Sequence, residues 1–187
     1  MLVFRNLTKQ KLLMRFFLFF SAFFLIFNLV AQDNYPAPPL TENRLFYIQH
    51  SKNFNTYVYD ANFLLPNYLN EKEPVNIYRI VFTEGGIKKS LTTFQRKLAY
   101  GIEASKISQN IYKLKLVAYS GFQLIMKIGQ DGKAFVETTV NNQTIILTRL
   151  FLKMKEGRSD FNPKLEYVLF YGFDNYGNKT SLRFVPS

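Results

Sequence analysis

One histidine is the only side chain of this sequence that changes charge near neutral pH without help, and a serine follows it directly. His50 and Ser51 precede Asp60, so the residue types of a Ser-His-Asp hydrolase are present. That chemistry requires the three side chains to converge, whereas neighbouring residues on a strand point to opposite faces. We therefore expect an exposed histidine at a strand end, and we keep a hydrolase that uses His50 or carboxylates as an alternative.

Polar side chains alternate just after this histidine. Ser51, Asn53 and Asn55 are separated by Lys52 and Phe54, which on a strand places the first three on one face. They are candidate ligand-binding residues, because their side chains can hydrogen-bond a sugar or another polar ligand. The alternative is that they bond their own backbone, as serine and asparagine often do.

Positive charge is concentrated in the middle of the chain. Residues 85–158 contain 13 basic and four acidic residues, a net charge of +9. Such a field favours acidic partners, namely anionic lipid, lipopolysaccharide or acidic glycans. The candidate ligand-binding residues here are four basic side chains and a tyrosine that offers a stacking face: Lys88, Lys89, Arg96, Lys97 and Tyr100. The alternative is that the lysines solvate the strands and block edge pairing.

The residue types and motifs of the chain argue against several chemistries. The chain has no cysteine and one histidine, which excludes disulfides, cysteine–zinc sites and paired-histidine metal sites. Glu84, Glu137 and Glu166 are too scattered to predict the carboxylate pair of a glycosidase. No nucleic-acid-binding motif is visible. We therefore predict no metal, no cofactor and no nucleic-acid partner.

The first 31 residues predict an export leader. Four basic residues precede an apolar stretch over residues 16–30, which Ala31 closes. A basic region, a short apolar region and a small residue are typical of a cleaved signal peptide, and the apolar stretch is shorter than the ~20 residues that span a bilayer. We expect export to the periplasm or the cell exterior, with no transmembrane span in the mature chain. An uncleaved membrane anchor is the alternative.

A short linker separates the leader from a single domain. Residues 32–43 contain Pro36, Pro38 and Pro39, which favour an extended, solvated arm. Residues 44–187 then form a domain of ordinary size. Without the four basic residues of the leader, 20 basic residues face 13 acidic ones, a net charge of +7.

Most of this domain is predicted to be β. Runs rich in β-branched and aromatic residues alternate with turn residues, giving expected strands at 45–49, 54–59, 75–83, 111–119, 122–128, 133–140, 144–154, 165–173 and 180–185. This spacing predicts an antiparallel meander of about eight or nine strands, as a sandwich or a small barrel. Six tyrosines can line a cavity or fill the core: Tyr57, Tyr59, Tyr78, Tyr119, Tyr167 and Tyr171.

One segment departs from the β pattern. Leu91, Phe94 and Leu98 have helical spacing between Ser90, a suitable N-cap, and Gly101, a suitable stop. We expect a single helix over about residues 90–100, lying against the sheet or closing one end of it.

Three runs are familiar in combination: SKNFNTYVYD (residues 51–60), PVNIYRIVF (74–82) and LTTFQRKLAYGI (91–102). With them, the chain resembles a family of small exported bacterial proteins described only as a domain of unknown function. The resemblance covers residues 44–185 and implies export and a single compact domain. It implies no activity, so no catalytic residue is transferred from it.

Together these features predict an exported, mostly β module that binds an anionic or amphiphilic envelope component and is not an enzyme. The alternatives are the hydrolase described above and a small outer-membrane β-barrel, which the strand count, the leader and the aromatic residues allow.

Overall fold

The structure is a computed structural model that describes residues 35–66, 68–157 and 164–186. The expected leader, residues 1–31, and the start of the linker lie outside these ranges. Within the described ranges, no helix has the length and hydropathy of a transmembrane span.

The described residues are mostly strand, with one α-helix, as the sequence predicted. The elements are β1 (Arg44–His50), β2 (Asn53–Ala61), β3 (Phe63–Leu65), β4 (Tyr68–Leu69), β5 (Val75–Val81), the 3-10 turn η1 (Phe82–Glu84), β6 (Ile87–Ser90), α2 (Thr93–Leu98), β7 (Ile102–Ser108), β8 (Ile111–Leu116), β9 (Tyr119–Ile128), β10 (Ala134–Val140), β11 (Gln143–Met154), β12 (Leu165–Phe173) and β13 (Lys179–Phe184).

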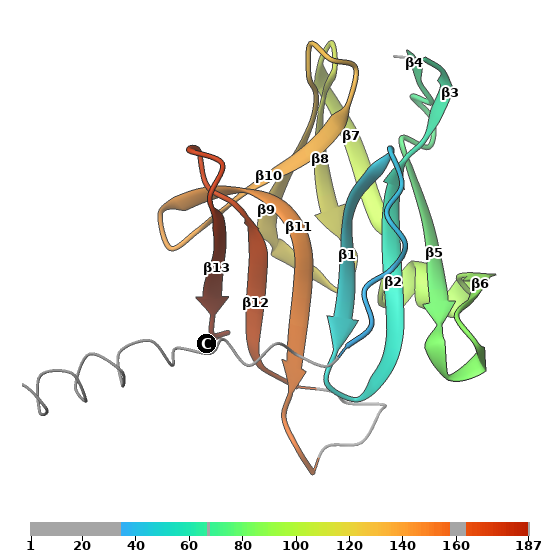
Figure 1. Cartoon of the computed structure of the whole chain (residues 1–187), viewed down its shortest axis with the longest axis vertical. Helices are drawn as coiled ribbons and strands as arrows, with labels where there is room; N and C mark the ends of the chain where they lie inside the picture. Colours follow the sequence, from blue (N-terminus) through green and yellow to red (C-terminus); the bar gives the residue numbers. More distant parts are fainter. Residues whose placement is uncertain (1–34, 67, 158–163, 187) are drawn as a thin grey trace, which may run out of the picture. The chain divides into compact units, whose positions relative to one another are not determined.

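Strand β11 is the point at which the main sheet divides (Figure 1). Its first half pairs with β10 and its second half pairs with β1, while β12 and then β13 follow its other edge. We call β1–β2–β5–β6 the first wing and β10–β9–β8–β7 the second wing. The two wings curl away from β11 as a half-barrel, and β3 and β4 form a separate two-stranded ladder.

The sheet is mixed, which corrects the expected purely antiparallel meander. β1 runs parallel to β11, with Tyr47 beside Arg149 and His50 beside Leu152, whereas the other ladders are antiparallel. Short turns identify antiparallel hairpins along the chain, but they carry no information on a partner far away in sequence. The parallel pair therefore left no local signal.

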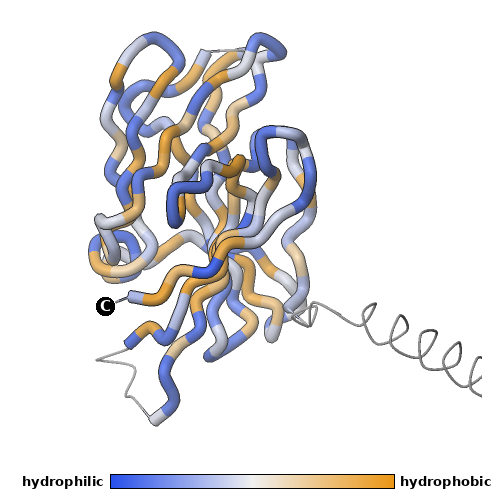
Figure 2. The backbone as a smooth tube through the Cα atoms, turned by 90° about the vertical axis from the view of Figure 1, so that its left-hand side faces the viewer, coloured by the Kyte–Doolittle hydropathy of each residue, from blue (hydrophilic) through white to orange (hydrophobic). Residues whose placement is uncertain are grey.

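Alternating hydrophobicity places the core between the wings. On β8, Leu114 and Leu116 are buried while Lys113 and Lys115 are exposed, the pattern of a strand with one solvated face. Residues of both wings and of β11 and β12 belong to one buried cluster. The same alternation of hydrophobic and hydrophilic positions is visible along the strands in Figure 2.

The outer face of the first wing is covered by the proline-rich segment. Gln49, a buried residue of β1, donates a hydrogen bond of 2.9 Å from its side-chain amide to the carbonyl of Pro36. The Tyr35 ring packs against Phe151 of β11, with centroids 5.1 Å apart, and Pro38 is buried. We expected a solvated arm here, but part of the segment from residue 35 onward packs on the sheet.

Helix α2 lies within the predicted range but begins later than Ser90. Thr92 is the N-cap, and it forms a capping box with Gln95. Ser90 instead pairs with Tyr78 as the last residue of β6. The helix buries none of its side chains: Phe94 is 68% exposed and Leu98 is 62% exposed.

Candidate ligand-binding cavity

A cavity of about 620 Å³ opens between the two wings. Its lining comes from β1, β2, the α2–β7 connection, the β8–β9 hairpin, β11 and β12. The lining residues are Ile48, His50, Lys52, Asn53, Tyr57, Leu98, Ala99, Tyr100, Leu116, Ala118, Tyr119, Phe122, Leu150, Leu152, Met154 and Leu165. The volume falls within the usual range of small-molecule sites.

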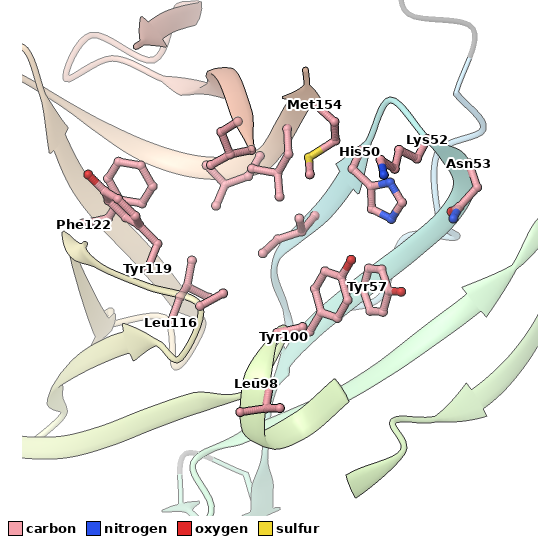
Figure 3. Close-up of a pocket in the computed structure, with 16 residues that line it drawn as sticks. His50, Lys52, Asn53, Tyr57, Leu98, Tyr100, Leu116, Tyr119, Phe122 and Met154 are labelled. Atoms are coloured by element: carbon pink, nitrogen blue, oxygen red, sulfur yellow. The ribbon is translucent and has the colours of Figure 1, made fainter. Parts of the chain in front are cut away.

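The charged and amide side chains of this cavity lie on one side of it (Figure 3). His50, Lys52 and Asn53 lie together at the β1–β2 hairpin. Leu116 and Phe122, from the β8–β9 hairpin, lie on the other side. A ligand with one polar end and an apolar body matches this division.

A stack of aromatic rings lines part of the cavity. The rings of Tyr57 and Tyr100 are nearly parallel, with centroids 3.3 Å apart. The His50 ring lies 6.2 Å from the Tyr57 centroid and 6.4 Å from the Tyr100 centroid. The stack offers an aromatic surface beside the polar group of the hairpin.

The end of helix α2 fixes Tyr100 in this stack. The backbone amide of Tyr100 donates a 2.8 Å hydrogen bond to the carbonyl of Gln95, and the hydroxyl of Tyr59 donates one of 2.8 Å to the carbonyl of Tyr100. At Gly101, an added Cβ would lie 1.9 Å from the carbonyl oxygen of Arg96. Glycine is therefore required for the chain to leave the helix so tightly.

The hydroxyls of Tyr57 and Tyr100 remain protonated at neutral pH. Burial raises the pKa of Tyr100, and its interactions with Tyr57 raise that pKa further. Burial also raises the pKa of Tyr57, although a hydrogen bond with Tyr100 and the charge of Arg79 partly oppose that rise. Neutral hydroxyls can donate hydrogen bonds to an anionic group.

Only some of the predicted polar residues reach the cavity. Asn53 lines it, but its side-chain oxygen also accepts a 2.9 Å hydrogen bond from the backbone amide of Asn55. Ser51 lies in the β1–β2 turn, where its hydroxyl accepts a 3.0 Å hydrogen bond from the amide of Met154. Ser51 and Asn55 are not among the lining residues.

The predicted basic residues lie outside the cavity. The Lys89 ammonium is 2.5 Å from a carboxylate oxygen of Glu84, and the Arg96 guanidinium is 3.4 Å from one of Glu73. The Lys88 ammonium lies over the ring of Tyr78, 3.6 Å from its centroid. Lys97 is exposed on α2. Tyr100 alone of this group lines the cavity.

The structure brings the proposed hydrolytic groups to different places. His50 lines the cavity and is buried, which corrects the expected exposed histidine. Asp60 instead accepts hydrogen bonds from Arg44, at 2.6 Å, and from Tyr78, at 2.9 Å, at the outer face of the first wing. The lining residues, all within the described ranges, include no Asp or Glu. The described residues also contain no cluster of three His, Cys, Asp or Glu side chains suited to a metal ion.

Sequence reasoning missed most of the cavity. Tyr57 and Tyr119 were among the six tyrosines that could line one, but Lys52, Leu152 and Met154 were not recognised. Their only sequence signal was proximity to the ends of predicted strands. That they meet depends on the parallel pairing of β1 with β11.

Comparisons with known proteins identify a family but no activity. The family model described as "Domain of unknown function (DUF4833)" matches residues 46–183. No curated protein and no solved structure matches significantly.

Proposed function

The chain belongs to the family of the domain of unknown function DUF4833, and from that premise we propose that it is an exported, non-catalytic module that binds an amphiphilic component of the cell envelope in the cavity between its wings. The single observation that carries this proposal is the division of the cavity. Its polar residues gather at the β1–β2 hairpin, and its remaining walls are largely aliphatic and aromatic.

The apolar walls favour binding over water-dependent chemistry. Leu150, Leu152 and Leu165 contribute aliphatic surface from β11 and β12, and burial of a ligand's apolar part against it is favourable by roughly 25 cal/mol per Å². The lining contains one histidine and one lysine, and none of its residues is an Asp or Glu that could support acid–base chemistry there. A passive carrier or sensor of an amphiphile needs no such support.

Export is the part of the proposal that rests on the sequence alone. The basic, apolar and small-residue order of the first 31 residues supports it. Native mass spectrometry of the chain recovered from its own cells tests export and binding together. We expect the mass of a chain trimmed near residue 31 and an additional non-covalent mass. An untrimmed chain contradicts export.

Filling the mouth of the cavity is expected to abolish binding. Ala118 lines the cavity and is exposed, so Ala118→Trp places a large side chain at the entrance without disturbing a buried residue. We expect the affinity for decanol or decanoate, measured by isothermal titration calorimetry, to fall by about tenfold or more, a change of about 1.4 kcal/mol or more.

Ala104→Trp is the matched control, because Ala104 is also exposed but lies on β7 and does not line the cavity. Its affinity should equal that of the unmodified chain. Equal affinities of A118W and A104W for both probes would show that the ligand does not enter the cavity.

A second control separates the cavity from the basic surface. None of Lys88, Lys89, Arg96 and Lys97 lines the cavity. The variant with all four replaced by Gln should therefore keep its affinity for decanol while losing part of any association with anionic vesicles. Loss of decanol binding in this variant would show that the ligand binds at the basic surface and not in the cavity.

A further inference from the structure

The strand register of the first wing extends the site beyond the cavity. Ile48 of β1 is opposite Tyr57 of β2, Tyr57 is opposite Arg79 of β5, and Arg79 is opposite Lys89 of β6. Directly opposed residues on antiparallel strands project from the same face. A row of four side chains thus runs from the cavity, lined by Ile48 and Tyr57, to two cationic residues.

Arg79 differs from Arg44 and Arg96 in its ion pairing. Arg44 and Arg96 form salt bridges with Asp60 and Glu73. Within the described ranges no carboxylate forms a salt bridge with Arg79, and its Nε is buried without a hydrogen-bond partner. A buried guanidinium N–H that donates to no acceptor is costly, and a carboxylate or phosphate satisfies a guanidinium best.

The neighbours of Arg79 in the row suit an anion. The Tyr57 hydroxyl stays protonated, because burial raises its pKa, and the charge of Arg79 acts on that hydroxyl. Lys89 lies at the far end of the row and adds positive charge. A carboxylate oxygen of Glu84, 2.5 Å from the Lys89 ammonium, partly neutralises that charge. In Figure 3 the Tyr57 hydroxyl points away from Leu116 and Phe122, on the side where Asn53 lies.

We propose that Arg79, with the hydroxyl of Tyr57, binds the anionic head group, carboxylate or phosphate, of the amphiphile whose apolar part occupies the cavity. This inference rests on the proposed function, since the cavity supplies the apolar half of the site. Arg79 itself does not line the cavity; Tyr57 stands between them, one strand away. The proposed position of the head group is therefore beside Tyr57, on the strand face that Tyr57 shares with Arg79.

Calorimetric titration of the chain with decanol, decanoate, decyl phosphate and inorganic phosphate tests this assignment. The unmodified chain is expected to bind decanoate or decyl phosphate about tenfold or more tightly than decanol. Arg79→Gln should bind decanol unchanged and lose that preference. The anion that shows the larger preference identifies the head group as carboxylate or phosphate.

Arg96→Gln is the matched control, since it removes the same charge from an exposed, salt-bridged arginine outside the row. R96Q should keep the full preference for the decyl anions over decanol. If R79Q does not fold, Arg79→Lys, which keeps the charge but loses the planar fork, is expected to lose several-fold of the affinity for the anions.

The outcomes separate this inference from the proposed function. The anion site is wrong, and the cavity proposal stands, if decanol binds and the decyl anions bind no more tightly than decanol. The same conclusion follows if R79Q or R79K binds the anions with the affinity of the unmodified chain. If no alkyl compound binds but inorganic phosphate binds the unmodified chain and not R79Q, the anion site stands and the cavity proposal fails.

Discussion

Tyr59 joins the core to the candidate site. Its side chain is fully buried, and its ring stacks on Phe46 with centroids 4.5 Å apart. Its hydroxyl supports the backbone of Tyr100. A tyrosine in a core usually needs a partner for its hydroxyl, and here that partner belongs to the segment that shapes the cavity.

Replacing Tyr59 with Phe is expected to change both stability and its dependence on pH. Loss of the hydrogen bond should reduce the free energy of unfolding by about 1 kcal/mol at neutral pH. Burial raises the pKa of Tyr59 well above its ordinary value. Below about pH 10 this tyrosine is neutral in both the folded and the unfolded chain, so its contribution to stability is fully present. Above that pH the unfolded chain releases a proton that the folded chain keeps. The free energy of unfolding therefore falls as the pH rises.

Y59F should therefore lose less stability than the unmodified chain between about pH 8 and about pH 11, measured by urea unfolding. Tyr176→Phe, at a residue that is 89% exposed, is the control and should follow the unmodified chain. Parallel declines for Y59F and the unmodified chain would contradict the argument.

Among the elements, α2 shows what sequence patterns can and cannot provide. Helical spacing correctly predicted a helix within residues 90–100, but it did not predict what the apolar face contacts. Phe94 and Leu98 have the spacing of a buried face and are exposed. The predicted cap, Ser90, is occupied in strand pairing with Tyr78, which is a tertiary contact that local preferences do not include.

Removing the capping box is expected to loosen the cavity wall. Thr92→Ala removes the acceptor for the backbone amide of Gln95, which should cost the helix about 1 kcal/mol. Because α2 buries none of its side chains, little packing opposes its fraying. Hydrogen exchange should accelerate at the amides of Arg96, Ala99 and Tyr100, which bond within this turn.

Thr93→Ala provides the control for this change, since Thr93 is exposed and is not the capping residue. It should leave those exchange rates close to their original values. Equal rates in T92A and the unmodified chain would show that the Tyr59 contact, rather than the cap, holds this segment.

The sequence missed β3, β4, β6 and β7, and for the last two the reason is exposure. Strands β6 and β7 lie at sheet edges and contain no buried residue. Without burial there is no alternation of apolar and polar residues to detect. The strands with a buried face, such as β1, β2, β11 and β12, were found within a few residues of their ends.

At the scale of the whole molecule, the core should unfold as one unit. Residues of both wings share one buried cluster, in which Leu147 of β11 is almost fully buried. Leu147→Ala should reduce the free energy of unfolding by about 2–5 kcal/mol. Transitions followed by circular dichroism and by tyrosine fluorescence should shift together in urea.

Ile146→Ala is the control on the same strand, because Ile146 is 37% exposed and its truncation removes less buried surface. It should shift the urea midpoint much less than L147A. Two separate transitions in the unmodified chain would show that the wings are independent.

The sequence predicted the β class and two cavity residues of the candidate set, Asn53 and Tyr100. It did not predict the cavity, because the cavity requires β1 to lie beside β11. It also did not show that some basic residues in the middle of the chain pair with carboxylates from outside that segment. Glu73 and Glu84, which pair with Arg96 and Lys89, precede the basic segment in sequence and meet it only in the fold.

The parallel ladder also determines the order in which the chain can assemble. Hairpins such as β9–β10 form between neighbouring residues, whereas Tyr47 meets its β11 neighbour Arg149 only after nearly the whole domain has been synthesised. Contacts between such distant residues lose more loop entropy before they form, and they slow folding. In a nascent chain one edge of β1 therefore stays without its strand partner until β11 emerges, and during that interval this edge is open to wrong pairing with other strands.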